Sequence, residues 1–493
     1  MDNLSDPIAD GSAARVAYPS LYLFIAGQRV HRTVAGTMPV LNPATEEVIG
    51  TLPIAGKAEL SAAVEAADRG FVVWSQMAPL ARSNIMREAA RIIRTRVDHY
   101  AACLVLEQGK TIVVAKAEWM STAEQLDWSA EEGRRTYGRV IPGRNNIVTQ
   151  TAYKMPVGPI AAFSPWNFPA WTAIQKVAPA LAAGCSIVIK AAEETPASVL
   201  LIAEALTEAG LPPGVLNVVY GHPAEISSHL IDSPVIRKIT FTGSIPVGRQ
   251  LAAAAGRQLK RSTMELGGHG PVIIAHDADI EKAASLGAMA KYRNAGQVCV
   301  SPTRFLVQRD RYDQFLESFI TAAKALKVGD GLDPETTMGP LANDRRIAAM
   351  EDFVADAEGS GGKRHTGGHR LNRPGYFFQP TVFGDVPTSS KMMNEEIFGP
   401  IAVINPFDQL EEAIDEANRL DYGLAAYCFS GSTKVADQIR RRVRTGMLAI
   451  NHYAVALSET PFGGIRNSGF GAEGGTEGVE AYLETFYVTH MME

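Results

Sequence analysis

Apolar runs alternate with amphipathic helical patterns along the central part of the chain. Five short runs rich in β-branched residues predict strands, and four helical patterns lie between them at the spacing of βαβ units. The expected strands lie within residues 157–165, 185–192, 214–221, 236–244 and 262–268. Runs that are apolar on both faces and joined by helical crossovers are typical of a parallel sheet covered on both sides. This region therefore predicts a doubly wound α/β fold of the nucleotide-binding type.

Further patterns flank this region. Upstream, residues 58–74 and 80–109 carry apolar positions at helical spacing and are expected to pack on the sheet. Downstream of Gly268 a second alternating set predicts another α/β unit. Its strands are expected within residues 271–277, 304–310, 401–408, 424–430 and 446–453. Residues 358–370, rich in glycine and charge, predict a surface loop.

Two extended segments stand apart from both sets of strands. Residues 138–155 and 479–492 show partial alternation of apolar and polar positions. Edge strands of this kind are seldom left unpaired. We therefore interpret both segments as arms that pair with other strands.

Composition and charge limit the partners. The chain has 493 residues, a net charge of −6 and no long run of lysine or arginine, which argues against nucleic acid or an anionic membrane as a partner. No apolar run approaches the roughly 20 residues that span a bilayer. The first 20 residues lack the apolar core of a secretory signal and are expected to form a loosely held tail. We expect a small-molecule partner.

The four cysteines are scattered singly. No CxxC pair or Cys/His spacing suggests a metal site, so we predict no metal and a reducing, cytoplasmic location. Cys299 stands out because it lies in the polar, glycine-containing stretch "NAGQVCVSP". Taken alone, a single cysteine is more often a packed core thiol than a nucleophile.

A strand-to-helix turn in the first region carries a possible phosphate site. In "FTGSIPVG", Gly243, Ser244 and Gly248 could bring N–H groups and a hydroxyl to a phosphate, although the stretch is not GxGxxG. Lys190 and Glu193 lie at the end of the neighbouring strand, where open α/β sheets bind ligands. The simpler interpretations are a plain turn and a surface charge at a helix start.

Four motifs, in this order and at these spacings, resemble the aldehyde dehydrogenase superfamily. They are "PWNFP" (165–169), "MELGG" (264–268), "GQVC" (296–299) and "EEIFGP" (395–400). The resemblance extends from about Tyr22 to the C-terminus. It implies a Rossmann-like cofactor domain, a second α/β catalytic domain and a small β oligomerisation arm that builds a homodimer or homotetramer. On this basis we assign residues 1–133 and 153–265 to NAD binding, 266–465 to catalysis, and 134–152 and 475–493 to the arm.

The resemblance also implies roles for individual residues. The Cys299 thiolate would attack the aldehyde carbon, Asn167 and the Cys299 N–H would hold the oxyanion, and Glu265 would act as general base. Lys176 and Glu473 match positions that support the site or relay protons. The residues implied for binding NAD are Trp166, Lys190, Glu193, Gly243, Ser244, Gly248, Glu396 and Phe398. For Trp166 and Phe398, core packing is an equally good interpretation.

The substrate is indicated by fewer residues. Arg293 resembles an arginine that holds the carboxylate tail in the succinic and α-ketoglutaric semialdehyde branch, and a guanidinium suits a carboxylate. Gln175 stands where that branch has a second arginine, and Ser458 could add a hydroxyl. We expect a short semialdehyde acid, with other polar or aromatic aldehydes as the alternative. Arg293 could instead cap its helix.

Two functions of other classes compete with this interpretation. A cysteine esterase or hydrolase would use the same thiolate and oxyanion donors without NAD. A non-catalytic binding protein would tolerate loss of the nucleophile. The joint presence of Cys299, Glu265, Asn167 and Glu396 speaks against the second alternative.

Overall fold

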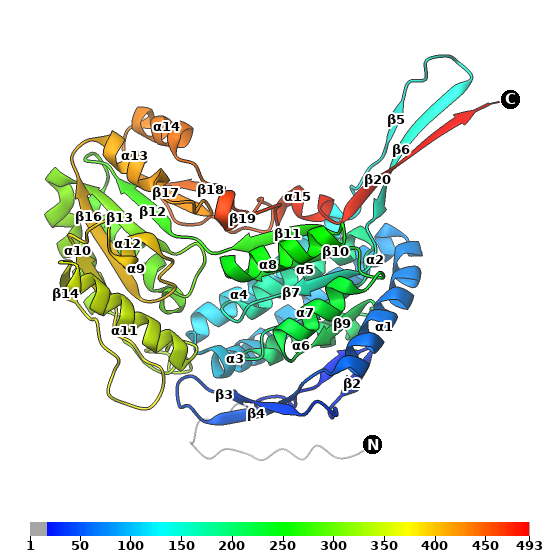
Figure 1. The fold of residues 1–493 in the computed structure, drawn as a ribbon, viewed down its shortest axis with the longest axis horizontal. Coiled ribbons are helices and arrows are strands. Elements are labelled where there is room, and N and C mark those ends of the chain that lie inside the picture. Colours follow the sequence, from blue (N-terminus) through cyan, green and yellow to red (C-terminus); the bar gives the residue numbers. More distant parts are fainter. Residues whose placement is uncertain (1–16, 493) are drawn as a thin grey trace.

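The first sheet has eight strands and contains the predicted parallel core (Figure 1). The computed structural model describes residues 17–492, so residues 1–16 of the expected tail lie outside the described residues. In spatial order the strands are β19 (Gly469–Phe470), β11 (Arg261–Leu266), β10 (Lys238–Gly243), β7 (Ile160–Phe163), β8 (Ile187–Lys190), β9 (Leu216–Val219), β1 (Leu23–Ile25) and β2 (Gln28–Val30). The five strands from β11 to β9 are parallel, and the outer strands are antiparallel. Strand order reverses between β7 and β10, which confirms a doubly wound sheet and marks its switch point.

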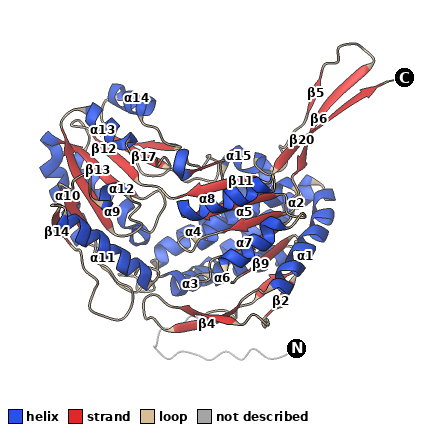
Figure 2. Ribbon diagram, in the orientation of Figure 1, coloured by secondary structure: helices blue, strands red, loops and turns tan. Residues whose placement is uncertain are grey.

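Helices cover both faces of this sheet (Figure 2). The helices are α1 (Lys57–Gln76), α2 (Pro79–Thr95), α3 (Val97–Gln108), α4 (Ile112–Glu132), α5 (Pro169–Ala183), α6 (Pro196–Glu208), α7 (Pro223–Asp232) and α8 (Ile245–Arg257). α5 and α6 pack with α2, α3 and α4, whereas α1 contacts α7, which contacts α8. The helical stretch expected at 80–109 is two helices that meet at Arg96. None of the helices within residues 17–492 has both the length and the apolar character needed to cross a bilayer.

The second sheet has seven strands. In spatial order they are β14 (Lys363–Thr366), β15 (Thr381–Gly384), β16 (Ile401–Phe407), β13 (Pro302–Gln308), β12 (Gly270–Ile274), β17 (Ala425–Phe429) and β18 (Met447–Ile450). Its helices are α9 (Ile280–Tyr292), α10 (Tyr312–Lys324), α11 (Asp344–Gly359), α12 (Lys391–Asn394), α13 (Leu410–Asn418) and α14 (Thr433–Arg442). The five predicted strands are all present and parallel. The surface loop expected at 358–370 is wrong in part, because four of its residues pair as β14 with the buried strand β15.

The two predicted arms pair with each other. β5 (Arg139–Ile141), β6 (Val148–Pro156) and β20 (Leu483–Met491) form a three-stranded antiparallel sheet that projects from the body of the molecule (Figure 1). A short helix, α15 (Gly475–Glu480), precedes β20 and packs on α5. A separate hairpin pairs β3 (Thr37–Leu41) with β4 (Val48–Pro53).

The two main sheets are joined end to end. β11 ends at Leu266 and β12 begins at Gly270, so the carboxyl edge of the first sheet meets the amino edge of the second. The loops after β7 and β10 therefore face the loops that precede β13 and β16. These loops contain three of the four motifs that carry the family resemblance, and the fourth, "MELGG", ends β11 and enters the connection to β12.

Candidate active site

A cavity of about 460 Å³ opens where these loops meet. Its walls come from both sheets and from the N-terminal halves of α4 and α5. The predicted site residues that line it are Trp166, Asn167, Gln175, Gly243, Ser244, Glu265, Arg293, Cys299, Glu396, Phe398 and Glu473. Five predicted residues, Lys176, Lys190, Glu193, Gly248 and Ser458, are not among the residues that line it. The structure thus brings together residues that are up to 307 positions apart in the sequence, from Trp166 to Glu473.

Cys299 is set apart from the other cysteines by its surroundings. It is half-buried and lines the cavity, whereas the other three cysteines are buried. The chain turns sharply after α9, where Asn294 and Ala295 have φ of 51° and 52°, a conformation uncommon for residues with a side chain. This turn places the Cys299 thiol where a small molecule in the cavity can reach it.

Carboxylates surround the thiol. Burial, followed by the charges of Glu396 and Glu265, raises the pKa of Cys299 to about 12. Burial and the neighbouring Glu473 raise the pKa of Glu265 well above its usual range, and neither of its carboxylate oxygens has a hydrogen-bond partner among the described residues. Burial likewise raises the pKa of Glu396 to about 7, although its carboxylate accepts a hydrogen bond from the Gly268 N–H at 3.1 Å. The resting thiol is therefore protonated, and a carboxylate of raised basicity lies in the same cavity.

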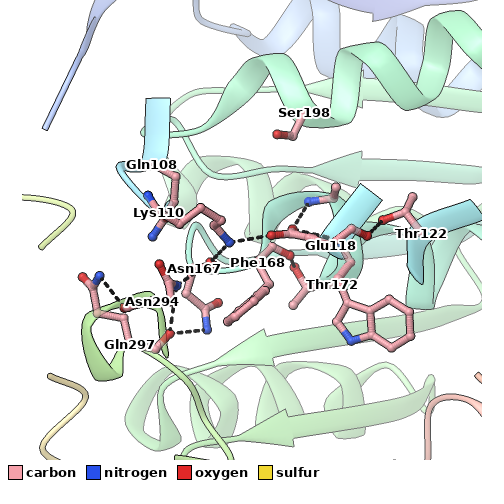
Figure 3. Close-up of polar contacts among 12 residues, drawn as sticks. Gln108, Lys110, Glu118, Thr122, Asn167, Phe168, Thr172, Ser198, Asn294 and Gln297 are labelled. Carbon is pink, nitrogen blue, oxygen red and sulfur yellow. Dashed lines mark hydrogen bonds and ion pairs between the residues drawn. The ribbon is translucent and has the colours of Figure 1, made fainter. Parts of the chain in front are cut away.

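Asn167 lies opposite the Cys299 loop (Figure 3). Its side-chain amide donates a hydrogen bond to the main-chain carbonyl of Gln297 at 3.0 Å. Its own main-chain carbonyl accepts from the Asn294 amide at 2.9 Å and from the Lys110 ammonium at 2.8 Å. The amide side chain thus lies at the cavity wall beside the thiol loop, as an oxyanion donor would require.

A buried ion pair lies behind Glu265. The Lys176 ammonium is 2.5 Å from the Glu473 carboxylate and 2.6 Å from the Thr242 hydroxyl. Glu473 lines the cavity, whereas the Lys176 side chain is completely buried. The charges of this pair act on Glu265 in opposite directions, since Glu473 raises its pKa and Lys176 lowers it.

The residues expected to hold a dinucleotide gather at the switch point of the first sheet. Ser244 is the residue before α8, and its side chain makes no cap bond to the helix, so the hydroxyl and the first N–H groups are free for a phosphate. Lys190 and Glu193 pair at 2.8 Å at the end of β8. Trp166 and Phe398 meet edge to face with ring centres 5.6 Å apart. This position and these donors fit a dinucleotide, which open α/β sheets bind at the switch point.

Gly248 has a packing role in the structure. A Cβ at this position would lie 2.3 Å from Leu266 Cδ2. The glycine therefore allows α8 to approach β11 closely. Its expected contribution to phosphate binding is indirect, through the position of the α8 N-terminus.

The expected substrate residues divide into two groups. The Arg293 side chain is exposed and lines the cavity with its guanidinium 5.4 Å from the Phe168 ring centre, and it makes no hydrogen bond or salt bridge to any described residue. The Gln175 amide is buried, lines the same cavity and has no partner for either polar atom within residues 17–492. Ser458 does not line the cavity, because its segment is held against α15 by a hydrogen bond from Gly475 N–H to its carbonyl.

One wall was not predicted from the sequence. α4 contributes Val113, Val114, Ala117, Glu118 and Ser121 to the cavity. The available signal was the segment "EQGKT" (107–111), where a lysine and a glycine interrupt two helical patterns. Gly109 has φ of +89° there and ends α3.

Comparison with known proteins identifies the family. Residues 30–488 match the aldehyde dehydrogenase family. The chain belongs to this family. It is 46% identical over 452 residues to 4-(hydroxymethyl)benzenesulfonate dehydrogenase TsaD1 of Comamonas testosteroni, covering 92% of this chain and 94% of that protein. It is 39% identical over 464 residues to the NADP(+) succinate-semialdehyde dehydrogenase GabD of Escherichia coli K12, covering 94% and 96%.

A solved structure agrees with this assignment. The crystal structure of an NAD-dependent aldehyde dehydrogenase from Sinorhizobium meliloti aligns with a TM-score of 0.95 at 33% identity, covering 98% of this chain and 97% of that one. The predicted family and α/β fold are confirmed. This aldehyde dehydrogenase is an NAD(P)-dependent enzyme, which favours oxidation of an aldehyde over the hydrolase and non-catalytic alternatives.

The raised thiol pKa predicts how this aldehyde dehydrogenase reacts with iodoacetamide when no ligand is bound. Only the thiolate is alkylated, and below the pKa its fraction rises about tenfold per pH unit. Alkylation of Cys299, followed by mass spectrometry, should therefore accelerate from pH 7 to pH 10 without a plateau. Glu396→Gln should speed the reaction at pH 8.5 by removing a negative charge beside the thiol. Glu395→Gln, at the exposed neighbour, is the matched control. A plateau below pH 8 would contradict the account.

Proposed function

We propose that this aldehyde dehydrogenase oxidises its substrate through a covalent thioester on Cys299. The observation that carries the proposal is the position of one accessible thiol beside an unpaired carboxylate, Glu265, and an amide donor, Asn167, in one cavity. The thiol sulfur attacks the aldehyde carbon and forms a thiohemiacetal. NAD, when bound, would accept a hydride from the former aldehyde carbon, and loss of this hydride converts the thiohemiacetal to a thioester. Water then hydrolyses the thioester to the carboxylic acid.

The residues of the cavity divide the proton and charge chemistry. Glu265 accepts the thiol proton and later a proton from the attacking water, because a carboxylate of raised pKa is closer in basicity to a thiol. The Asn167 amide and the Cys299 N–H donate to the oxyanion. Glu473 and Lys176 lie behind Glu265 and provide a route by which a proton leaves it.

We propose an aldehyde with an anionic tail as the substrate, first a short semialdehyde acid such as succinic or α-ketoglutaric semialdehyde. The exposed guanidinium of Arg293, which has no carboxylate partner among the described residues, and the buried unpaired amide of Gln175 support this, because a polar ligand in the cavity would pair with the first and satisfy the second. An anionic aromatic aldehyde is the second candidate. Phe168, Trp171 and Phe462 give the cavity aromatic walls, and one relative carries a benzenesulfonate in its name.

Arg293→Ala tests the anionic tail. If Arg293 pairs with the tail, the variant should lose about 2–5 kcal/mol of transition-state binding for semialdehyde acids and for carboxy- or sulfobenzaldehyde. This loss is measured as a lower kcat/KM. Neutral aliphatic aldehydes and benzaldehyde should change little. NADH formation across this panel gives the measurement, with Arg257→Ala, an exposed arginine at the end of α8, as the control. Equal losses for charged and neutral aldehydes would remove the anionic-tail proposal.

We propose NAD as the preferred cofactor. Glu193 lies at the end of β8, where a carboxylate can accept hydrogen bonds from a ribose and repel a 2′-phosphate. Its pairing with Lys190 and a hydrogen bond from the Gly221 N–H at 3.0 Å hold it in place.

Glu193→Ser should therefore relax the preference. The substitution removes the repulsion and frees the Lys190 ammonium for a 2′-phosphate, so kcat/KM with NADP should rise relative to NAD. Glu194→Ser, the neighbouring carboxylate that pairs with Arg345, should leave the ratio unchanged. A wild-type enzyme with higher kcat/KM for NADP than for NAD would show that the proposal is wrong.

We propose that the arm formed by β5, β6 and β20 builds a homodimer or homotetramer. β5 and β20 are the two edges of a small projecting sheet, and exposed hydrophobic side chains such as Val140, Phe486 and Tyr487 lie on them. Light scattering at micromolar concentration should give the mass of two or four chains. A monomer would refute this assembly.

A further inference from the structure

Lys110 and Glu118 form a buried ion pair beside the cavity (Figure 3). Lys110 lies in the loop between α3 and α4, and Glu118 lies on α4. The ammonium and carboxylate are 2.5 Å apart, and both side chains are 0% exposed. Burying two charges carries a large desolvation penalty, and an apolar pair of similar volume often stabilises a fold equally well. Stability alone therefore does not explain the pair, and the other contacts of the two charges indicate what they do.

Lys110 holds the residue that carries the proposed oxyanion donor. Its ammonium donates to the main-chain carbonyl of Asn167 at 2.8 Å. It also lies 3.8 Å from the ring centre of Phe168, within the range of a cation–π contact. Two consecutive residues at the cavity wall are thus fixed by one buried cation.

Glu118 holds the helix that follows. Its second carboxylate oxygen accepts hydrogen bonds from the main-chain N–H groups of Ala170 at 3.0 Å and Trp171 at 3.2 Å. The residue before α5, Phe168, provides no side-chain cap. Glu118 therefore caps α5 from another helix, and its negative charge suits the positive end of the helix dipole.

The same contacts continue to the loop that contains Cys299. Asn294 donates to the Asn167 carbonyl from the side of that loop at 2.9 Å. The Asn167 amide then donates to the Gln297 carbonyl at 3.0 Å, two residues before Cys299. Two donors hold the main chain of Asn167, and the bond to the Gln297 carbonyl holds its side-chain amide at the cavity wall.

We propose that the Lys110–Glu118 pair is a positioning device that orients the Asn167 amide toward the carbonyl oxygen of a substrate bound at Cys299. The inference rests on the proposed function, since it assigns a purpose to the pair only if Asn167 stabilises an oxyanion. One N–H of the amide is used by Gln297, and the second remains for the substrate. A shift of about 1 Å in such a donor can lower a rate by about 10²-fold.

Lys110→Met tests the device, because methionine is an unbranched side chain one heavy atom shorter than lysine and carries no charge. We expect kcat to fall by roughly 10²-fold with little change in KM for the aldehyde or in NAD binding measured by fluorescence. In an Asn167→Ala background the same substitution should have almost no further effect, because the two residues act as one unit. Lys116→Met, at a lysine on α4 whose side chain is 48% exposed, is the control and should leave kcat unchanged.

A loss of folding must be separated from a loss of positioning. Lys110→Met/Glu118→Gln removes both charges and keeps an amide oxygen that can still accept from the Ala170 and Trp171 N–H groups, so Tm should return toward that of the wild type while kcat stays low. If neither variant folds, Asn294→Ala provides the test, because it removes the other side-chain donor to the Asn167 carbonyl. Its loss of kcat should disappear in the Asn167→Ala background.

Three results would overturn the inference: wild-type kcat in the folded double variant, wild-type kcat in Asn294→Ala, or effects of Lys110→Met and Asn167→Ala that multiply. Failure of the proposed function has a different signature. In that case the wild-type enzyme itself would reduce no NAD with any aldehyde of the panel, or Cys299→Ala would remain active.

Discussion

The chain crosses from one sheet to the other through a segment that has no room for side chains. A Cβ at Gly267 would lie 2.3 Å from Glu396 Oε2, and a Cβ at Gly268 would lie 2.6 Å from the Cys299 carbonyl oxygen. Neither glycine has a positive φ, so the requirement is for space and not for backbone freedom. This close crossing directly after Glu265 brings the segments that contain Glu265, Cys299 and Glu396 into one cavity. The rest of the site is built around it.

The crossing also brings several acidic groups close together in the cavity. Glu265, Glu396 and Glu473 converge on a space that also holds one thiol. Burial raises the pKa values of Glu265, Glu396 and the thiol, and neighbouring negative charges raise those of Glu265 and the thiol further, so none of these groups ionises easily alone. Lys176 offsets the charge on the inner side. Two arginines also line the cavity: Arg346 donates to the main-chain carbonyls of Ile397 and Phe398, and Arg293 makes no hydrogen bond to a described residue, so it suits a substrate that brings its own negative charge.

The amino-acid sequence predicts the sheets well because their information is local. Apolar β-branched runs and helical crossovers mark the parallel strands, and four motifs mark the loops at their ends. The strand β14 was missed because its sequence, "KRHT", is polar and pairs only at a sheet edge. Local patterns do not predict which side chains of distant elements contact each other. Lys110 and Glu118 contact residues more than 50 positions away, and the wall formed by α4 depends on the packing of α4 against α5.

The direction of a side chain is equally hidden from the sequence. Ser458 and Arg293 were both expected near the substrate, and only the structure shows that Arg293 lines the cavity and that Ser458 does not. Glu265 likewise is identified by its motif, but its lack of any hydrogen-bond partner is a property of the folded cavity.

The central claim is a covalent acyl group on Cys299, and it can be observed directly. The enzyme is mixed with NAD and a semialdehyde acid, quenched with acid during turnover, digested and analysed by mass spectrometry. The account predicts that the peptide containing Cys299 gains the mass of the acyl group, that Glu265→Gln loses this acyl group more slowly once NAD and aldehyde are removed, and that Cys299→Ala shows no adduct and no NADH. NADH formation by the wild-type enzyme with the acyl group on another cysteine, or by the Cys299→Ala variant, would contradict the account.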